Sequence, residues 1–219
     1  MKVVEIFKSI DGEGKRAGLP TTFIRLYGCN LRCSYCDTKY SYDDNSSVMN
    51  MTPYDILERV KMYGVKSVTV TGGEPLIHKD INILLELLIA EGFNINIETN
   101  GAVDLLPFIE NFAFAHSSGQ LFFTMDYKCP SSGCENEMIL SNIKLLRPLD
   151  VLKFVVGTDA DLGRAKSISK YCNAQVYVSP VFDEIKLKEM TNYVINNMPD
   201  AKVQLQLHKI IWDKNERGV

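Results

Sequence analysis

Residues 67–98, SVTVTGGEPLIHKDINILLELLIAEGFNINIE, contain the unit from which the rest of the chain is built. The apolar, β-branched run at 67–70 predicts a buried strand, and 94–98 predicts a second one. Between them, 79–91 repeats apolar residues at helical spacing and stops at Gly92, which is typical of a helix with one buried face. A strand, a helix and a strand in this order predict two parallel strands joined by a crossover helix.

The same alternation continues on both sides of this unit. Further strands are predicted at 2–7, 21–27, 121–126, 151–156, 175–179 and 202–207. Further helices are predicted at 53–63, 103–111, 137–147, 160–171 and 186–197. We therefore predict an α/β protein, a partial and open parallel β/α barrel of about six β-α units, because a closed barrel needs eight. No repeat or linker interrupts the pattern, so residues 1–219 are predicted to form a single domain.

The composition is that of an ordinary globular protein. Apolar residues make up 46% and charged residues 23%, and the net charge of -3 gives no electrostatic reason to expect nucleic acid or an anionic membrane as a partner. No apolar run approaches the ~20 residues that span a bilayer, and the first residues contain no signal-peptide core. We expect a cytoplasmic protein. Its six cysteines then indicate metal binding or plain thiols, not disulfides.

Three cysteines follow one another closely, at Cys29, Cys33 and Cys36, with the spacing C-x3-C-x2-C. Three thiolates can bind three irons of a 4Fe–4S cluster and leave the fourth iron open to an external ligand, whereas a ferredoxin-type carrier closes its cluster with four protein ligands. A structural zinc site also needs four ligands, usually as two spaced pairs. Three clustered reduced thiols, or part of a zinc site, remain the alternatives from spacing alone. No role is assigned to Cys129, Cys134 and Cys172.

This spacing, with Tyr35 just before the last cysteine, resembles the radical S-adenosylmethionine (SAM) superfamily. The Gly-Gly-Glu-Pro at 72–75, directly after a predicted strand, resembles the SAM-binding motif of the same superfamily. The resemblance implies a 4Fe–4S cluster whose open iron is chelated by SAM, and a reduced cluster that cleaves SAM to a 5′-deoxyadenosyl radical. It also implies that Gly73 holds the methionine amino group and that the backbone of 35–37 contacts the adenine (Tyr35, Cys36 and Asp37).

Ligands of parallel β/α proteins lie at the carboxyl ends of the strands, so polar residues there are candidate SAM contacts. Glu98 ends a predicted strand and is expected either to bind the amine or ribose of SAM or to cap the next helix. The other candidates of this kind are Asp126, Tyr127, Lys128 and Ser179.

Further stretches resemble one family within this superfamily, the 7-carboxy-7-deazaguanine synthases. They are Asp11-Gly12-Glu13-Gly14, Phe23-Ile24-Arg25-Leu26 just before the cysteines, Cys36-Asp37-Thr38, and, near the last residue, Gln206-Leu207-His208-Lys209 and Arg217-Gly218-Val219. The family usually has Gln-Gly-Glu-Gly at 11–14, so the departure at Asp11 puts a glutamine side-chain contact in doubt and leaves a backbone contact possible.

The resemblance implies a carbon–nitrogen lyase of queuosine and 7-deazapurine biosynthesis. It would convert 6-carboxy-5,6,7,8-tetrahydropterin to 7-carboxy-7-deazaguanine by ring contraction and loss of ammonia, with SAM regenerated. It also implies a magnesium ion bound by Thr38, an electron donor such as flavodoxin or ferredoxin, and a homodimer. The implied substrate contacts are Ile10, Asp11, Gly12, Glu13, Arg25, Thr71, His208 and Val219.

Arg25 is also expected to need a partner on physical grounds. An arginine inside a barrel strand is costly to bury unpaired, so it should meet either Glu13 or a carboxylate of a ligand. Two other functions are compatible with the cysteine spacing: an activase of a glycyl-radical enzyme, and a non-catalytic iron–sulfur or zinc protein.

Overall fold

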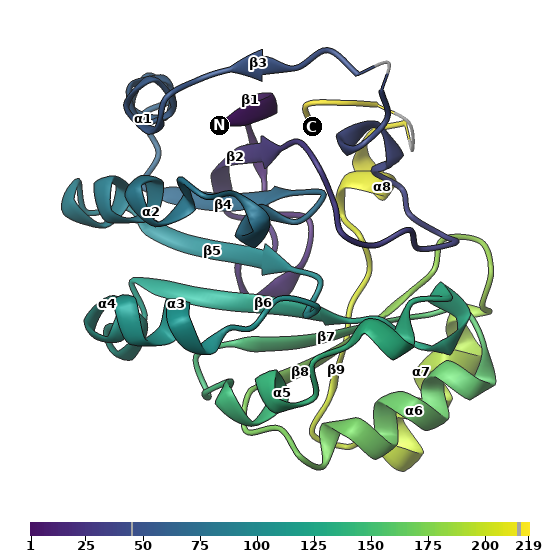
Figure 1. Cartoon of the computed structure of the whole chain (residues 1–219). Helices are drawn as coiled ribbons and strands as arrows, with labels where there is room; N and C mark the ends of the chain where they lie inside the picture. Colours follow the sequence, from purple (N-terminus) through teal and green to yellow (C-terminus); the bar gives the residue numbers. More distant parts are fainter. Residues whose placement is uncertain (45, 214–215) are drawn as a thin grey trace.

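The computed structural model describes residues 1–44, 46–213 and 216–219, and in this part of the chain all strands belong to one sheet (Figure 1). The nine strands lie in the order β3-β1-β2-β4-β5-β6-β7-β8-β9. From β2 onward the neighbours pair in parallel, whereas β1 is antiparallel to both β2 and β3 at one edge. The strands are β1 (Lys2–Ile10), β2 (Pro20–Leu26), β3 (Met49–Asn50), β4 (Ser67–Gly72), β5 (Asn94–Thr99), β6 (Leu121–Tyr127), β7 (Val151–Val156), β8 (Gln175–Pro180) and β9 (Lys202–Val203).

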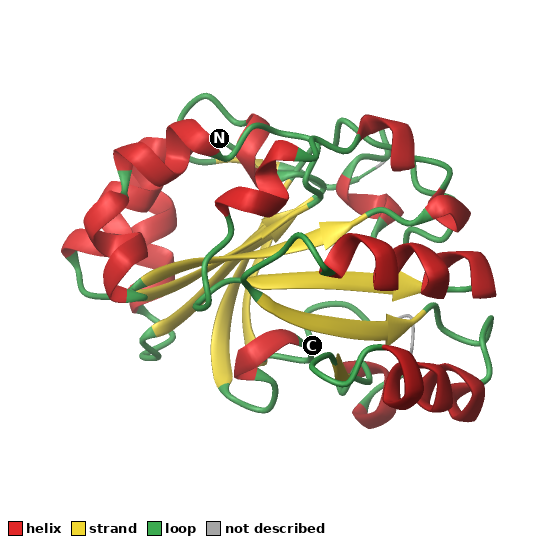
Figure 2. Ribbon diagram, turned by 90° about the horizontal axis from the view of Figure 1, so that it is seen from below, coloured by secondary structure: helices red, strands yellow, loops and turns green. Residues whose placement is uncertain are grey.

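Helices connect the parallel strands and cover the outer side of the curved sheet, as Figure 2 shows. The prediction of an open, partial β/α barrel of about six units is confirmed, because each step from β2 to β9 in the parallel series contains at least one helix. The helices are α1 (Pro53–Lys61), α2 (Ile81–Ala90), α3 (Leu106–Asn111), α4 (Ala113–Ser118), α5 (Ser141–Leu145), α6 (Asp159–Ser169), α7 (Leu187–Asn197) and α8 (His208–Ile211).

Local sequence signals account for the ends and faces of the helices. The Thr52 hydroxyl accepts from the Asp55 N–H, the Asp55 carboxylate accepts from the Thr52 N–H, and Pro53 occupies the first turn of α1. Helix α2 buries Leu84 and Leu88, one turn apart, against the sheet. No helix in the described ranges has the length and apolar character needed to cross a membrane.

Successive side chains of each strand point to opposite faces of the sheet, and this determines which residues face the inside of the barrel. In β4, Val68 and Val70 belong to the hydrophobic core under the helices. Thr69 and Thr71 lie on the opposite, concave face. The same alternation puts polar residues of the next strands on the concave face, namely Asn96, Glu98, Thr124, Asp126 and Lys153. The inside of the barrel is therefore polar.

Several predicted elements are shorter than their sequence pattern indicated. The predicted helix at 103–111 is shortened to α3, and α4, which was not predicted, follows after Phe112, a buried residue in a non-helical conformation. The predicted helix at 137–147 is reduced to α5, since the N–H of Ile139 donates to the carbonyl of Gly101 at 3.2 Å and not within a helix. The predicted strand at 202–207 is wrong beyond Val203, where the chain turns away toward residues 12–14.

Candidate active site at the carboxyl ends of the strands

A cavity of about 920 Å³ opens where the parallel strands end. The loop of residues 29–42, the strand ends, residues 10–13 and the segment around α8 enclose it, on the side toward which β4–β8 point in Figure 1. The sequence-predicted residues that line this cavity are Ile10, Asp11, Gly12, Glu13, Arg25, Cys29, Cys33, Tyr35, Cys36, Asp37, Thr38, Thr71, Gly73, Glu98, Asp126, Lys128, His208 and Val219.

Two predicted residues do not present their side chains to the cavity. Tyr127 alternates with Asp126 in β6, so its ring enters the core beside Phe154 and its hydroxyl donates to Glu135 at 3.0 Å. The side chain of Ser179 is completely buried and does not line the cavity. A contact from either residue to a ligand in the cavity would therefore have to come from the backbone.

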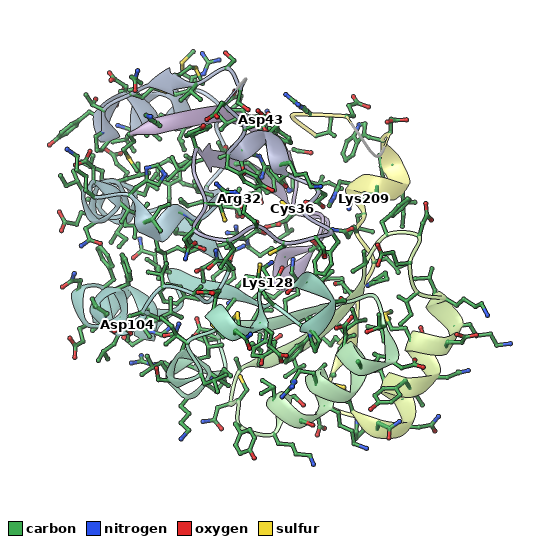
Figure 3. The ribbon with its side chains drawn as sticks, turned by 45° about the vertical axis from the view of Figure 1, so that its right-hand side comes forward. Arg32, Cys36, Asp43, Asp104, Lys128 and Lys209 are labelled. Atoms are coloured by element: carbon green, nitrogen blue, oxygen red, sulfur yellow. The ribbon has the colours of Figure 1, made fainter. Side chains whose placement is uncertain are left out.

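The cysteine loop is held against its neighbours by the backbone. The N–H of Gly28 donates to Ser41 O at 2.7 Å, and the N–H and hydroxyl of Ser34 donate to Ser132 O and Ser131 O at 3.0 and 2.7 Å. Cys29, Cys33 and Cys36 all line the cavity. In Figure 3, Cys36 lies near Lys128, which follows β6, and Lys209 of α8, and all three residues line the same cavity. The loop thus presents three thiols to one open space.

The three thiols suit a cluster better than a single ion. A single ion needs its ligands at one point, and in the described part of the chain no three His, Cys, Asp or Glu side chains meet in that way. A cubic cluster binds each thiolate through a different iron, so its ligands stand apart around the cube. Burial raises the pKa of Cys29 and raises that of Cys33 to about 12, so both are neutral thiols that lose their protons when metal binds.

The Gly72-Gly73 turn after β4 packs directly on the cysteine loop. A Cβ atom at Gly73 would lie 2.1 Å from the carbonyl oxygen of Gly28 and 2.7 Å from Cβ of Cys29, so only glycine fits this position. The Glu74 N–H donates to the same Gly28 oxygen at 2.8 Å. The backbone of this turn therefore lies beside the first cysteine, where it can reach a ligand of the cluster.

Two residues of this region were missed by the sequence interpretation. The buried carboxylate of Glu74 accepts from Asn100 N–H, Leu76 N–H and the Thr99 hydroxyl at 2.7, 3.1 and 3.0 Å, which joins the turn after β4 to the turn after β5. The side-chain amide of Asn100 donates to Sγ of Cys29 at 3.7 Å. Glu74 stands in the Gly-Gly-Glu-Pro motif, from which only Gly73 was given a role, and the signal for Asn100 was the polar Thr99-Asn100-Gly101 that follows a strand.

Asp11 lines the cavity and forms a buried ion pair with Arg16, which lies behind it in the protein. Arg16 Nε donates to Asp11 Oδ2 at 3.2 Å, and its Nη2 donates to Thr69 Oγ1 and Val68 O at 2.7 and 3.0 Å. Burial raises the pKa of Asp11 to about 7 and lowers that of Arg16. The Asp11 N–H donates to Leu19 O at 2.8 Å, so that donor is engaged within the loop.

Arg25 has an anionic partner within the protein, Glu5, which the sequence interpretation did not name. Its Nε donates to Glu5 Oε1 at 2.7 Å, across the antiparallel pair of β1 and β2. The Tyr40 hydroxyl donates to the same oxygen at 3.0 Å, and the Arg217 guanidinium lies 4.1 Å from the centre of the Tyr40 ring. The expectation of a Glu13 partner is therefore wrong, because Glu13 is paired elsewhere.

Hydroxyl and carboxylate groups meet at two further positions of the cavity wall. The Thr71 hydroxyl donates to Glu98 Oε2 at 2.8 Å, so Glu98 faces the cavity and does not cap the next helix. The Thr38 hydroxyl donates to Asp37 Oδ1 at 2.8 Å and makes no helix-cap bond. Lys209 Nζ lies 2.9 Å from Asp37 Oδ2. Desolvation opposes ionisation of Asp37, but the charge and hydrogen bond of Lys209, the Thr38 hydroxyl and the charge of Lys153 together lower its pKa.

A group of paired charges joins the loop of residues 10–13 to β6 and β7. Lys153 Nζ lies 3.3 Å from Glu13 Oε2 and 3.6 Å from Asp126 Oδ2, and Lys128 Nζ lies 3.0 Å from the same Asp126 oxygen. Burial works to raise the pKa of Glu13, but Lys153 and a hydrogen bond from Gln206 lower it overall. The sequence interpretation missed Lys153, although a lysine inside a strand of a parallel sheet is an unusual residue.

The site has relatives among known proteins. The model of the radical SAM superfamily matches residues 23–155. The crystal structure of QueE from Escherichia coli is similar in fold, with a TM-score of 0.73, 23% identity, and 94% of this chain and 93% of that chain covered. That of SuiB from Streptococcus suis, bound to its precursor peptide SuiA, has a TM-score of 0.61 and 18% identity over 83% of this chain and 47% of that chain.

With the three-cysteine loop and the glycine turn in one cavity, and this match over more than half of its length, the chain belongs to the radical SAM superfamily. Two curated relatives make the assignment narrower. The 7-carboxy-7-deazaguanine synthase of Clostridium acetobutylicum is 46% identical over 100% of this chain and 99% of the relative. That of Methanospirillum hungatei is 41% identical over 96% of this chain and 85% of the relative. The chain belongs to the family of the 7-carboxy-7-deazaguanine synthases.

Proposed function

We propose that this enzyme converts 6-carboxy-5,6,7,8-tetrahydropterin to 7-carboxy-7-deazaguanine. We also propose that the pterin and SAM bind together in the cavity described above. Its relatives carry the name of that product. The observation that carries the proposal is that one cavity is lined both by the three cysteines and by the loop of residues 10–13. A cofactor on the cysteine loop and a substrate on residues 10–13 would thus share one enclosed space.

Cys29, Cys33 and Cys36 would hold a 4Fe–4S cluster. When bound, the cluster and SAM supply a 5′-deoxyadenosyl radical. The main-chain carbonyl at Gly73 would accept a hydrogen bond from the amino group of SAM, because the close packing on Gly28 leaves no room for a side chain there. Asp126 and Lys128, on the same wall, would bind the polar groups of the methionine and ribose.

Arg25 would bind the carboxylate of the pterin. The Glu5 contact uses the Nε edge of the guanidinium, and a guanidinium has five N–H donors, so donors remain for a second carboxylate. Tyr40 and Glu5 then orient the guanidinium and do not compete with the substrate. This arrangement pre-organises the arginine before substrate binds.

The opposite edge of the pterin carries amino and ring N–H groups, which need acceptors. Glu13, the backbone of Ile10 and Gly12, and His208 would supply the contacts on this side. Burial lowers the pKa of His208, so its ring is neutral at pH 7 and offers both a donor and an acceptor. The remaining contacts would come from the Asp11 carbonyl, Thr71 and Val219, which also line the cavity.

A magnesium ion would bind at the Thr38 hydroxyl. Magnesium prefers oxygen ligands and retains water, so one hydroxyl, the substrate carboxylate and several waters form a suitable coordination shell. Asp37, which accepts from Thr38 at 2.8 Å, would fix the hydroxyl orientation. We also propose that the chain is a single domain, acts as a homodimer and receives its electron from a protein such as flavodoxin or ferredoxin.

Anaerobic turnover tests the proposal. The reconstituted enzyme, with magnesium, SAM, a reductant and 6-carboxytetrahydropterin, should release 7-carboxy-7-deazaguanine without an equal loss of SAM. Arg25→Ala should abolish product while SAM cleavage persists. Release of 5′-deoxyadenosine without product would reject this substrate, and wild-type turnover of Arg25→Ala would reject the role of Arg25.

A further inference from the structure

Lys153 lies at a junction that the proposed function does not explain. It sits in β7 opposite Asp126 of β6 in the parallel register, and its side chain is only 11% exposed. Its ammonium is within 3.3 Å of Glu13 Oε2 and 3.6 Å of Asp126 Oδ2. One buried cation thus touches a carboxylate from the substrate-side loop and a carboxylate from the cofactor-side strand.

Each of these two carboxylates is bound through one oxygen only. Glu13 Oε2 also accepts from Gln206 Nε2 at 3.2 Å, and Asp126 Oδ2 also pairs with Lys128 at 3.0 Å. Within the described residues, the second oxygens, Glu13 Oε1 and Asp126 Oδ1, are buried and accept no hydrogen bond. Buried carboxylate oxygens without donors are costly, and both residues line the cavity, so a ligand is the natural source of the missing donors.

We propose that Lys153 is a positioning residue that couples the two halves of the site. It holds Glu13 so that Oε1 accepts an N–H of the pterin, and it holds Asp126 so that Oδ1 accepts an amine or hydroxyl hydrogen of SAM. This inference rests on the proposed function, since the two ligands are those assigned there. It adds a residue that touches neither reacting atom and orients a contact to each ligand.

The charges around Lys153 explain why a cation is needed there. Glu13 also faces His208 and Asp37, and Asp126 also faces Lys128 and Tyr35. Without the ammonium of Lys153, Glu13 loses its nearest positive charge while Asp37 remains. Burial and like charge then both favour the protonated carboxyl, which donates where the ligand needs an acceptor.

The experiment measures the dissociation constants of 6-carboxytetrahydropterin and SAM separately, by equilibrium titration of the anaerobic, cluster-loaded enzyme between pH 5.5 and 8.5. Lys153→Met should raise the dissociation constants of both ligands at least tenfold at pH 6.5. Lys153→Arg, which keeps the positive charge, should retain most of the affinity. The loss of pterin affinity in Lys153→Met should shrink as the pH rises, because Glu13 ionises again. A purely structural role would weaken binding equally at all pH values.

Matched lysine variants separate the two contacts. Lys128→Met removes a cation that pairs with Asp126 and not with Glu13, so it should weaken the binding of SAM and leave the binding of the pterin unchanged. Lys166 lies on the outer helices, where its ammonium donates to the Asn197 side chain at 2.8 Å, away from the cavity. Lys166→Met should therefore bind both ligands as the wild type does. In a Glu13→Gln background, Lys153→Met should have no further effect on pterin.

Three results for Lys153→Met would overturn the inference. They are unchanged affinity for both ligands, reduced affinity for only one of them, and a loss of pterin affinity that does not depend on pH. If Lys153→Met does not fold, Lys153→Gln is titrated instead, and the same results support or overturn the role of Lys153. If the wild type does not bind the pterin, the proposed function fails, and the SAM titration still decides whether Lys153 orients Asp126.

Discussion

Gly73→Ala should disable the enzyme by moving the cysteine loop. The new Cβ would lie 2.1 and 2.5 Å from the carbonyl oxygen and carbon of Gly28 and 2.7 Å from Cβ of Cys29. Ordinary contact begins near 3.5 Å, so the two backbone segments must separate by about 1 Å. Overpacking of this kind costs ~1–3 kcal/mol of stability, and a ~1 Å misplacement of a reacting group lowers rates by about 10²-fold.

The assay combines urea unfolding, iron content after reconstitution, and the rate of 5′-deoxyadenosine formation with SAM. We expect lower stability by the amount above and at least a 100-fold slower SAM cleavage. Gly163→Ala is the matched control: it lies inside α6 with no atom within 4 Å of its Cβ position, so the same change should raise helix stability by ~0.5–1 kcal/mol. Wild-type stability, iron and cleavage in Gly73→Ala would refute the packing argument.

Three further changes probe other contacts. Asn100→Ala removes the hydrogen bond to Sγ of Cys29, so the midpoint potential of the cluster, measured by redox titration, should become more negative; an unchanged potential would contradict the contact. Arg217→Ala removes the stacking on the Tyr40 ring and should raise the KM for the pterin with little change in Tm, which steady-state kinetics and calorimetry would show. Phe154→Ala empties a completely buried position and should cost ~3–5 kcal/mol in urea unfolding; a loss below ~1 kcal/mol would show that the core collapses onto the cavity.

The order of the secondary structure was predictable because it rests on local patterns. The spacing of apolar residues and the helix-capping residues predicted the β-α units. The Thr52–Pro53 signal correctly predicted the start of α1. Elements governed by distant partners were not predictable in the same way. The chain after Val203 looks like a strand, but the Gln204 side chain instead binds the backbone of Gly14 and draws the segment out of the sheet.

In the candidate site, too, residues in short motifs were predictable and pairings between distant residues were not. Cys29 and Gly73 stand in short motifs, and the structure brings them into contact as neighbours in one cavity. The pairing of Arg25 with Glu5 depends on the register of an antiparallel strand pair, which no local pattern reveals. Tyr127 was included with its neighbours, but alternate residues of a strand face opposite sides, so its side chain enters the core and the predicted SAM contact depends on its backbone.

The hydrogen bonds between residues 12–14 and residues 204–207 also affect the order in which parts of the cavity wall form during synthesis. Gly14 N–H donates to Gln204 Oε1 at 2.7 Å across 190 residues of chain, and Leu207 N–H donates to Gly12 O at 3.1 Å. On a ribosome adding about 5–20 residues per second, the loop waits roughly 10–40 s for these partners. The cysteine loop and the Gly73 turn emerge long before that. A nascent chain can therefore bring the cysteine loop and the Gly73 turn together well before residues 204–207 are available to hold residues 12–14 in place.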